Sequence, residues 1–220
     1  MRTVIFDLDG TLADTSGDLI AAANACFRAM GAGDVLDPLR DAGTAFHGGR
    51  AMLRLGFARI GRAADEAAVD RYYDDLLAAY ERAIDVHTVL YPGALEAVGA
   101  LSEAGFRVGI CTNKPEPLAE LLTARLGVRD AFASLVGAGV LPRKPDAAPF
   151  VEAVRRAGGD PARALLVGDT ETDFRTARAA GVPAVLVTFG PEGERVAALG
   201  PEAAIGHFDE LPEVATRLLP

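Results

Sequence analysis

The feature that most constrains this 220-residue chain is a series of short apolar runs that alternate with helical repeats from residue 91 onward. Each run has the length of a buried strand, and Gly, Pro or Asp residues punctuate the series. We expect a first strand that opens with Val4, Ile5 and Phe6 and ends at Asp7 and Asp9. Further strands are expected over residues 107–112, 133–137, 164–169 and 184–189, with a weaker one over 204–207. We expect helices over residues 94–104, 117–126, 146–157, 172–180 and 212–219. This alternation predicts an α/β fold: a Rossmann-like parallel sheet core with helices on both faces.

The segment between the first strand and residue 91 lacks a strand pattern. Its apolar residues recur at helical spacing in three stretches. The first has Ser16 as its expected N-cap and ends at Gly31, the second begins at Arg50, and the third covers about residues 65–84. We therefore predict two domains: an α/β core formed by residues 1–15 and 89–220, and an inserted all-helical domain of residues 16–88.

Two carboxylates stand where the first strand ends. In an open parallel sheet, ligands bind at the carboxyl ends of the strands. Asp7 and Asp9 are two residues apart, a spacing that places both side chains on one face of a strand. Carboxylates about 4 Å apart repel by roughly 4 kcal/mol at an effective dielectric near 20, so this pair predicts a cation or a proton between them.

The ends of the later strands carry further polar side chains. Thr112 and Asn113 follow the second strand, and Lys144 follows the third, held extended by the proline after it. Asp169 ends the fourth strand, and Asp173 lies one helical turn later on the same side. Carboxylate oxygens suit a hard divalent cation, and Mg2+ is the cation that we expect.

Overall charge and cysteine content narrow the class of protein. The net charge of -9 argues against nucleic acid and anionic membrane as partners, because both require a basic face. Apolar runs stay shorter than the about 18 residues of a membrane span, and a signal peptide pattern is absent from the start of the sequence. The two cysteines, Cys26 and Cys111, fall in different predicted elements and indicate reduced thiols. These features predict a cytoplasmic protein.

Lysine is scarce in this chain. Only two of the 22 basic residues are lysines, Lys114 and Lys144, and both fall beside predicted strand ends. A chain that uses arginine elsewhere for surface charge is expected to use lysine where a compact ammonium is needed.

The order and spacing of these residues resemble the haloacid dehalogenase (HAD) superfamily of phosphotransferases. The matching segments are Asp7–Leu12, Thr112–Pro115, Lys144–Asp146 and Gly168–Asp173. The resemblance covers the whole chain, since the inserted helical block lies where that family has its C1-type cap domain. The second segment is most similar to phosphoglycolate phosphatases. The resemblance thus implies hydrolysis of a small phosphorylated metabolite, 2-phosphoglycolate, to glycolate and phosphate.

The resemblance also implies roles for the residues that react. Asp7 would attack the phosphorus and become an aspartyl phosphate. Asp9 would protonate the leaving alkoxide and then deprotonate the attacking water. Lys144 would neutralise charge on Asp7 and on the phosphate, while Thr112 and Asn113 would hold phosphoryl oxygens.

The implied Mg2+ ligands come from three parts of the chain. They are Asp7, the backbone of Asp9, and Asp169, with Asp173 as a direct or water-mediated ligand. The sequence departs from the family where Ala147 replaces a proline that often follows the lysine, with Pro149 nearby instead. We expect this change to shift a helix start and to leave the chemistry unaltered.

Arg50 is the candidate in the inserted domain. Gly48 and Gly49 precede it, so the backbone there can approach a ligand closely, and a helix start favours an anion. We expect Arg50 to bind the carboxylate of the substrate. The alternative, a solvated helix residue beside a tight turn, stays open at this point.

Two other activities also fit these residues. One is a sugar phosphomutase of the β-phosphoglucomutase kind, which passes phosphate between two hydroxyls and protects its aspartyl phosphate from water. The other is a phosphatase that acts on sugar phosphates or pyrophosphate. Steady release of inorganic phosphate separates the phosphatases from the mutase. The sequence leaves monomer and homodimer both open.

Overall fold

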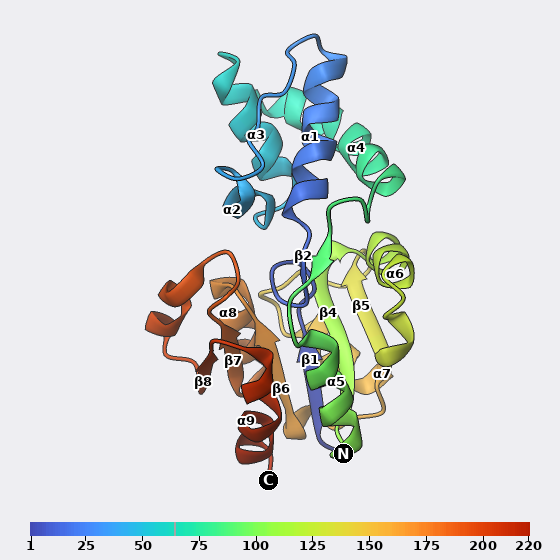
Figure 1. The fold of residues 1–220 in the computed structure, drawn as a ribbon, viewed down its shortest axis with the longest axis vertical. Coiled ribbons are helices and arrows are strands. Elements are labelled where there is room, and N and C mark those ends of the chain that lie inside the picture. The colour runs from blue at the N-terminus through green and yellow to red at the C-terminus, as the bar shows by residue number, and fades with distance from the viewer. Residues whose placement is uncertain (64) are drawn as a thin grey trace. The chain divides into compact units, whose positions relative to one another are not determined.

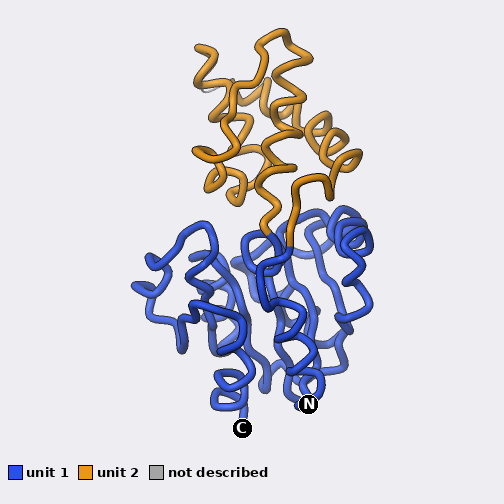
Figure 2. Tube along the Cα trace, in the orientation of Figure 1, with its two compact units in different colours: residues 1–13, 90–220 blue, residues 14–89 orange. Residues whose placement is uncertain are grey.

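The computed structural model describes residues 1–63 and 65–220 of the chain. It contains two compact units (Figure 2). The core unit consists of Met1–Ala13 and Leu90–Pro220, and the inserted unit is Asp14–Val89. Two short strands, β2 (Ala13–Asp14) and β3 (Val89–Leu90), pair where the chain passes from one unit to the other.

The core unit is built on one six-stranded sheet with the order β5-β4-β1-β6-β7-β8 (Figure 1). All of its strand pairs are parallel, which confirms the predicted Rossmann-like sheet. The strands are β1 (Thr3–Phe6), β4 (Arg107–Pro115), β5 (Ser134–Ala138), β6 (Ala164–Gly168), β7 (Ala184–Val187) and β8 (Ala203–Ile205). The central strand β1 is buried along its whole length, as its unbroken apolar sequence predicts.

Helices connect these strands and cover the sheet. They are α5 (Ala94–Glu103), α6 (Glu116–Arg125), α7 (Ala148–Arg156), α8 (Glu171–Ala180) and α9 (Leu211–Leu218). Right-handed crossovers place α5 and α6 on one face and α7 and α8 on the other. On the second face, Ile5, Cys111 and Leu166 form a buried apolar core with Phe150 of α7.

The strand order explains where a ligand site can form. The chain leaves β1 toward β4 and β5, and then crosses to β6 and continues to β7 in the opposite direction. The connections therefore diverge between β1 and β6, the kind of switch point at which α/β sheets bind ligands. Asp7 follows β1 directly and Asp169 follows β6 directly. The backbone N–H of Asp7 donates to the carbonyl oxygen of Val167 at 2.9 Å, which keeps these two strand ends level.

The inserted unit is helical. Its helices are α1 (Ser16–Ala29), α2 (Ala42–Ala45), α3 (Gly49–Arg59) and α4 (Glu66–Arg82). Phe27 of α1 packs edge-to-face on Phe57 of α3, with ring centroids 5.4 Å apart. The two helices approach closely at Gly56, where a Cβ atom would lie 2.1 Å from the Phe27 ring.

Buried polar side chains hold the loops of the inserted unit. The Asp18 carboxylate accepts hydrogen bonds from the backbone N–H groups of His87 and Thr88 and from the Thr88 hydroxyl. The segment that leaves the unit is thus tied to the first turn of α1. Asn24 binds the backbone N–H and carbonyl of Leu36 in the same way, so its side chain fixes the loop after α1.

The start of α1 differs from the expectation. Thr15, and not Ser16, occupies the N-cap position, and its side chain makes no capping hydrogen bond. The Ser16 hydroxyl instead donates to the carboxylate of Asp14 at 2.6 Å. The prediction of Ser16 as the cap was wrong because a nearby carboxylate is a stronger acceptor for its hydroxyl.

Two further boundaries are shifted, and prolines account for both. Strand β4 continues to Pro115, three residues beyond the predicted end, because the residue before a proline is kept extended. Helix α7 begins at Ala148, two residues later than predicted, because Pro149 fits only in the first turn of a helix. The short helix α2 was not predicted.

Within the part of the chain that the structure describes, no helix is long and apolar enough to cross a membrane. Cys26 and Cys111 are both buried and free, as the sequence predicts. Burial raises the pKa of the Cys111 thiol to about 12, so this thiol stays protonated and acts as a core residue.

Candidate active site

Three carboxylates from the strand ends meet at the switch point. Asp7, Asp169 and Asp173 each offer one oxygen, and these oxygens all lie within 4.8 Å of one another. Asp7 is more than 150 positions from Asp169 and Asp173 in sequence, so the pairing of β1 with β6 brings it to them. An arrangement of this size is compatible with one divalent cation held by oxygen ligands.

Asp169 carries the strongest indication of a cation site. It is 0% exposed, and its Oδ1 accepts a hydrogen bond from the Thr11 hydroxyl at 2.6 Å. Its Oδ2 is buried and has no hydrogen-bond donor among residues 1–63 and 65–220. Burial, together with repulsion from Asp173 and Asp7, raises the pKa of this carboxyl well above its ordinary value. Burying an unpaired carboxylate is costly, and a bound cation at Oδ2 would remove that cost.

The backbone around Asp169 leaves room for its carboxylate. Gly10 has a φ of +83°, and a Cβ atom at this position would lie 2.4 Å from Asp169 Oδ2. A Cβ atom at Gly190 would lie 2.8 Å from the Cβ of Asp169. Only glycine fits at Gly10, both for its left-handed backbone and for this close approach.

Asp173 both caps helix α8 and holds a lysine. Its Oδ2 accepts hydrogen bonds from the Thr170 hydroxyl at 2.6 Å and from the backbone N–H groups of Thr170 and Asp169. Its Oδ1 accepts from Lys144 Nζ at 2.6 Å. Asp173 therefore contributes through positioning, and its predicted role as a direct or water-mediated metal ligand stays a prediction.

Lys144 joins the carboxylates of two elements. Its Nζ lies 2.6 Å from Asp173 Oδ1 and 3.0 Å from Asp7 Oδ1, and its side chain is 1% exposed. Burial lowers the pKa of Lys144, but the charges of Asp173 and Asp7 more than offset this and raise the pKa above its ordinary value. Lys144 is therefore a fixed positive charge at Asp7.

The negative charge of Asp7 is only partly compensated by its neighbours. Burial raises its pKa from the ordinary value of 3.8 to about 6, with Asp173 and Asp9 adding repulsion and Lys144 opposing the shift. Its Oδ1 also accepts a hydrogen bond from the Leu8 N–H at 2.7 Å. A carboxylate kept in one orientation beside an ammonium is suited to nucleophilic attack on an anion.

Asn113 fixes the backbone of Lys144. Its Oδ1 accepts from the Lys144 N–H at 2.9 Å, and its Nδ2 donates to the Lys144 carbonyl at 3.0 Å. The structure thus shows Asn113 as a positioning residue, and its expected contact with a phosphoryl oxygen stays a prediction. Thr112 is buried beside it, and its hydroxyl accepts from the Lys114 N–H at 3.2 Å.

Asp9 pairs with Lys114, the other lysine of the chain. Lys114 Nζ lies 2.8 and 3.0 Å from the two carboxylate oxygens of Asp9. Contrary to the prediction from the sequence, Asp7 and Asp9 do not share one face of a strand, because β1 ends at Phe6 and both residues lie beyond it. Each carboxylate contacts a different lysine. The side chain of Asp9 is not one of the three grouped carboxylates, so its role as a ligand rests on its backbone and stays a prediction.

Arg50 lies in the inserted unit, as the second residue of α3. Its guanidinium is paired with Asp70 and stacks over the Tyr73 ring, 4.3 Å from the ring centroid. Both partners belong to α4, so Arg50 links the two helices. Its predicted contact with substrate stays a prediction.

Sequence reasoning assigned no role to Thr11 or Lys114. Thr11 holds Asp169, and Lys114 holds Asp9. The scarcity of lysine had indicated a functional position for Lys114 without a specific role, and both lysines of the chain lie at this site. Thr11 carries no comparable signal, because threonine is common in turns.

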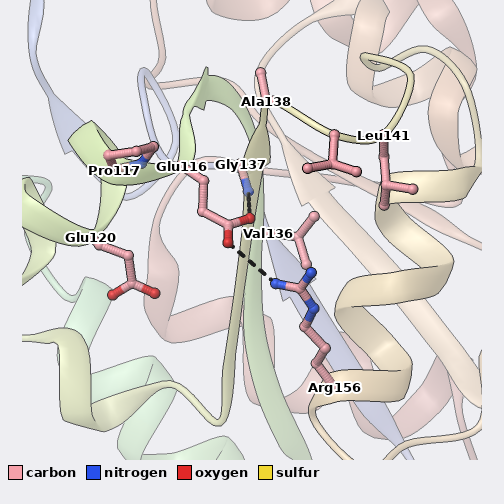
Figure 3. A pocket seen from close by; sticks show the side chains of 10 residues that line it. Glu116, Pro117, Glu120, Val136, Gly137, Ala138, Leu141 and Arg156 are labelled. Carbon is pink, nitrogen blue, oxygen red and sulfur yellow. Dashed lines mark hydrogen bonds and ion pairs between the residues drawn. The ribbon is translucent and has the colours of Figure 1, made fainter.

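A separate pocket of about 500 Å³ lies along the sheet edge formed by β5 (Figure 3). Glu116 of α6 accepts a hydrogen bond from the Gly137 N–H at 3.0 Å and pairs with Arg156 of α7. Arg156 also donates to the Leu135 carbonyl at 3.3 Å. The residues that line this pocket do not include any of the predicted site residues.

Comparison with known proteins places the chain in a family. A model of the haloacid dehalogenase-like hydrolases matches residues 1–181. The chain is 41% identical over 220 residues to a phosphoglycolate phosphatase of Mesorhizobium japonicum, covering 98% of this chain and 96% of that protein. It is 37% identical to a phosphoglycolate phosphatase of Agrobacterium fabrum, covering 94% of this chain and 89% of that protein.

Solved structures show the same fold. The crystal structure of a predicted phosphoglycolate phosphatase from Haemophilus somnus superposes with a TM-score of 0.84 at 23% sequence identity and covers 97% of both chains. This likeness shows that the chain has the fold of that protein. The chain therefore belongs to the haloacid dehalogenase-like hydrolases, and its enzyme class is that of a phosphoric monoester hydrolase.

Proposed function

We propose that this enzyme is an Mg2+-dependent phosphatase that hydrolyses 2-phosphoglycolate to glycolate and phosphate through an aspartyl-phosphate intermediate. The observation that carries the proposal is the buried Oδ2 of Asp169, which lacks a donor within the described chain and lies with Asp7 in one group of carboxylates. The names of the relatives from Mesorhizobium japonicum and Agrobacterium fabrum support the substrate.

The residues present fit Mg2+. Asp7, Asp169 and the backbone of Asp9 would hold it, with Asp173 as a direct or water-mediated ligand. When bound, Mg2+ would neutralise charge on the phosphoryl group and orient it toward Asp7.

The reaction divides into two displacements at phosphorus. In the first, an Asp7 oxygen forms a bond to phosphorus, the ester bond breaks, and Asp9 gives its proton to the departing alkoxide. In the second, Asp9 takes a proton from water, the water oxygen bonds to phosphorus, and the bond to Asp7 breaks. Lys144 offsets negative charge throughout, and Thr112 would donate its O–H to a phosphoryl oxygen. Acid–base assistance of this kind contributes about 100- to 10,000-fold.

A phosphate-release panel tests the proposal. With Mg2+ present, we expect the highest kcat/KM for 2-phosphoglycolate among a set that also contains glucose 6-phosphate, pyrophosphate and a nucleotide, and we expect EDTA to abolish turnover. A higher kcat/KM for a sugar phosphate would overturn the assignment of 2-phosphoglycolate as the substrate. Conversion of β-glucose 1-phosphate to glucose 6-phosphate without release of phosphate would instead identify a mutase.

Arg50→Ala tests the contribution of the inserted unit. We expect the KM for 2-phosphoglycolate to rise about tenfold or more, because a guanidinium bound to a carboxylate is worth about 1.5–3 kcal/mol. The KM for a phosphate ester whose leaving group is uncharged should stay constant. Arg54→Ala is the matched control, since Arg54 lies one turn later on α3 and pairs with Glu66 at the surface. Equal changes for both substrates would remove Arg50 from substrate recognition.

A further inference from the structure

The two lysines of the chain contact different carboxylates of the site. Lys144 lies between Asp7 and Asp173, where the phosphoryl group would bind. Lys114 forms an ion pair with Asp9, and the side chain of Lys114 is 3% exposed. The core unit therefore places one buried ammonium at the nucleophile and a second one at the carboxylate that would serve the leaving group.

We propose that Lys114 determines substrate specificity by binding the carboxylate of the leaving group. This inference rests on the proposed function, because it takes Asp9 as the group that contacts the leaving oxygen. In 2-phosphoglycolate, the carboxylate carbon lies only two bonds from the ester oxygen. An ester oxygen within hydrogen-bond reach of Asp9 thus brings the carboxylate next to the ammonium that Asp9 already binds.

The charge of the substrate supports this assignment. The phosphate of 2-phosphoglycolate carries up to two negative charges, which face Lys144 and the proposed cation. The third charge, on the carboxylate, needs positive partners in a site already rich in aspartates, and Lys114 would supply one from the core unit in addition to the Arg50 contact proposed above. Lys114 is shielded from solvent, so its attraction to a second anion is weakened little by salt or by bulk water.

The chemistry of the side chain fits a group shared by two carboxylates. An ammonium has three N–H donors that point in different directions, whereas the planar fork of arginine would match Asp9 alone. The backbone of Lys114 is also fixed, since it lies within β4 and its N–H donates to the Thr112 hydroxyl. Lys114 can therefore bind Asp9 and a substrate carboxylate from one rigid position.

The test compares two substrates that differ only in the carboxylate. These are 2-phosphoglycolate and 2-hydroxyethyl phosphate, in which a neutral CH2OH group replaces it. We expect the Lys114→Met protein to show a KM for 2-phosphoglycolate that is about 10- to 100-fold higher than that of the wild type, from the loss of one charged hydrogen bond. The KM for 2-hydroxyethyl phosphate should change less than about threefold. Lys114→Arg keeps the charge and should lie between the two proteins.

A purely structural role for Lys114 gives a different result. If it only orients Asp9, the Lys114→Met change lowers kcat for both substrates by the same factor and leaves their KM ratio constant, and the inference is wrong. A wild-type enzyme with equal kcat/KM for the two esters would also overturn it while leaving the phosphatase intact. Failure of the proposed function is distinguishable, since the wild type would then hydrolyse neither ester faster than the Asp7→Asn protein.

A second measurement does not depend on the stability of the Lys114→Met protein. With the wild type and p-nitrophenyl phosphate as the reporter substrate, we expect glycolate to inhibit competitively and ethylene glycol at the same concentration to have no effect. The Lys114→Arg protein should bind glycolate more weakly than the wild type does. Equal inhibition of both proteins by glycolate, or no inhibition of the wild type, would contradict the assignment.

Discussion

Replacing Asp7 by asparagine is expected to lower kcat for phosphate release by about 10,000-fold or more. An amide oxygen is a poor nucleophile, so the covalent step is lost, and loss of a nucleophile has an effect of roughly this size in other hydrolases. Asparagine keeps the shape of the side chain, and its carbonyl oxygen still accepts a hydrogen bond from Lys144. The measurement is phosphate release under saturating 2-phosphoglycolate and Mg2+. A variant that kept the full rate would exclude Asp7 as the nucleophile.

The same variant reports on the electrostatics of the site through its stability. Burial raises the pKa of Asp7 to about 6, so between about pH 4 and pH 6 the folded protein keeps a proton that the unfolded chain releases. Metal-free wild type should therefore lose stability relative to Asp7→Asn as the pH rises through this window, by up to roughly 3 kcal/mol. Urea unfolding in EDTA at pH 4, 5, 6 and 7 measures the difference. Asp130→Asn, at an exposed position of the core unit, is the control, and its stability relative to the wild type should show no such trend.

The second large effect is expected for Asp169→Asn. The Mg2+ concentration for half-maximal activity should rise about 100-fold or more, because one charged ligand is lost from the carboxylate group. The Thr11 hydroxyl can still donate to the amide oxygen, so the loop keeps its anchor. Mg2+ should raise the Tm of the wild type and leave that of the variant unchanged, since a ligand stabilises only a protein that binds it.

Metal-free stability provides an independent result for Asp169. In EDTA, we expect Asp169→Asn to be more stable than the wild type, because the change removes a buried carboxylate that has only one hydrogen-bond donor among the described residues. Glu171→Gln is the matched control, as Glu171 is exposed at the start of α8. Its Mg2+ requirement should equal that of the wild type. An Asp169→Asn protein with normal Mg2+ dependence would show that the carboxylates do not hold the metal.

The sheet and the approximate site could be predicted because strand ends follow from short apolar runs. The run before Asp7 and the run before Asp169 each mark one strand, and the parallel-sheet rule then places their ends together. The same logic placed Lys144 near them. Placing these residues together requires only the order and the direction of the strands, and the alternation of strand and helix patterns in the sequence predicts both.

The pairing of individual side chains could not be predicted in the same way. Asp7 contacts Lys144 and Asp9 contacts Lys114, and this choice depends on the path of the chain after β1, which includes a left-handed residue at Gly10. Asn113 appeared as a phosphate ligand because its position in the chain suggests exposure to the crevice. Its contact with a phosphoryl oxygen stays a prediction, and its amide also matches the N–H and carbonyl of Lys144, which are 31 residues away in sequence. Such tertiary matches leave no periodic signal.

The pocket in Figure 3 has a consequence for how this protein behaves at high concentration. An outer strand of a sheet normally presents backbone groups to which a foreign strand can be added, and this is a common route to aggregation. On β5, the Gly137 N–H is already bound by Glu116 and the Leu135 carbonyl by Arg156. A foreign strand would have to displace both side chains before it could pair here, so these two charged residues protect this edge of the sheet against fibril-like growth.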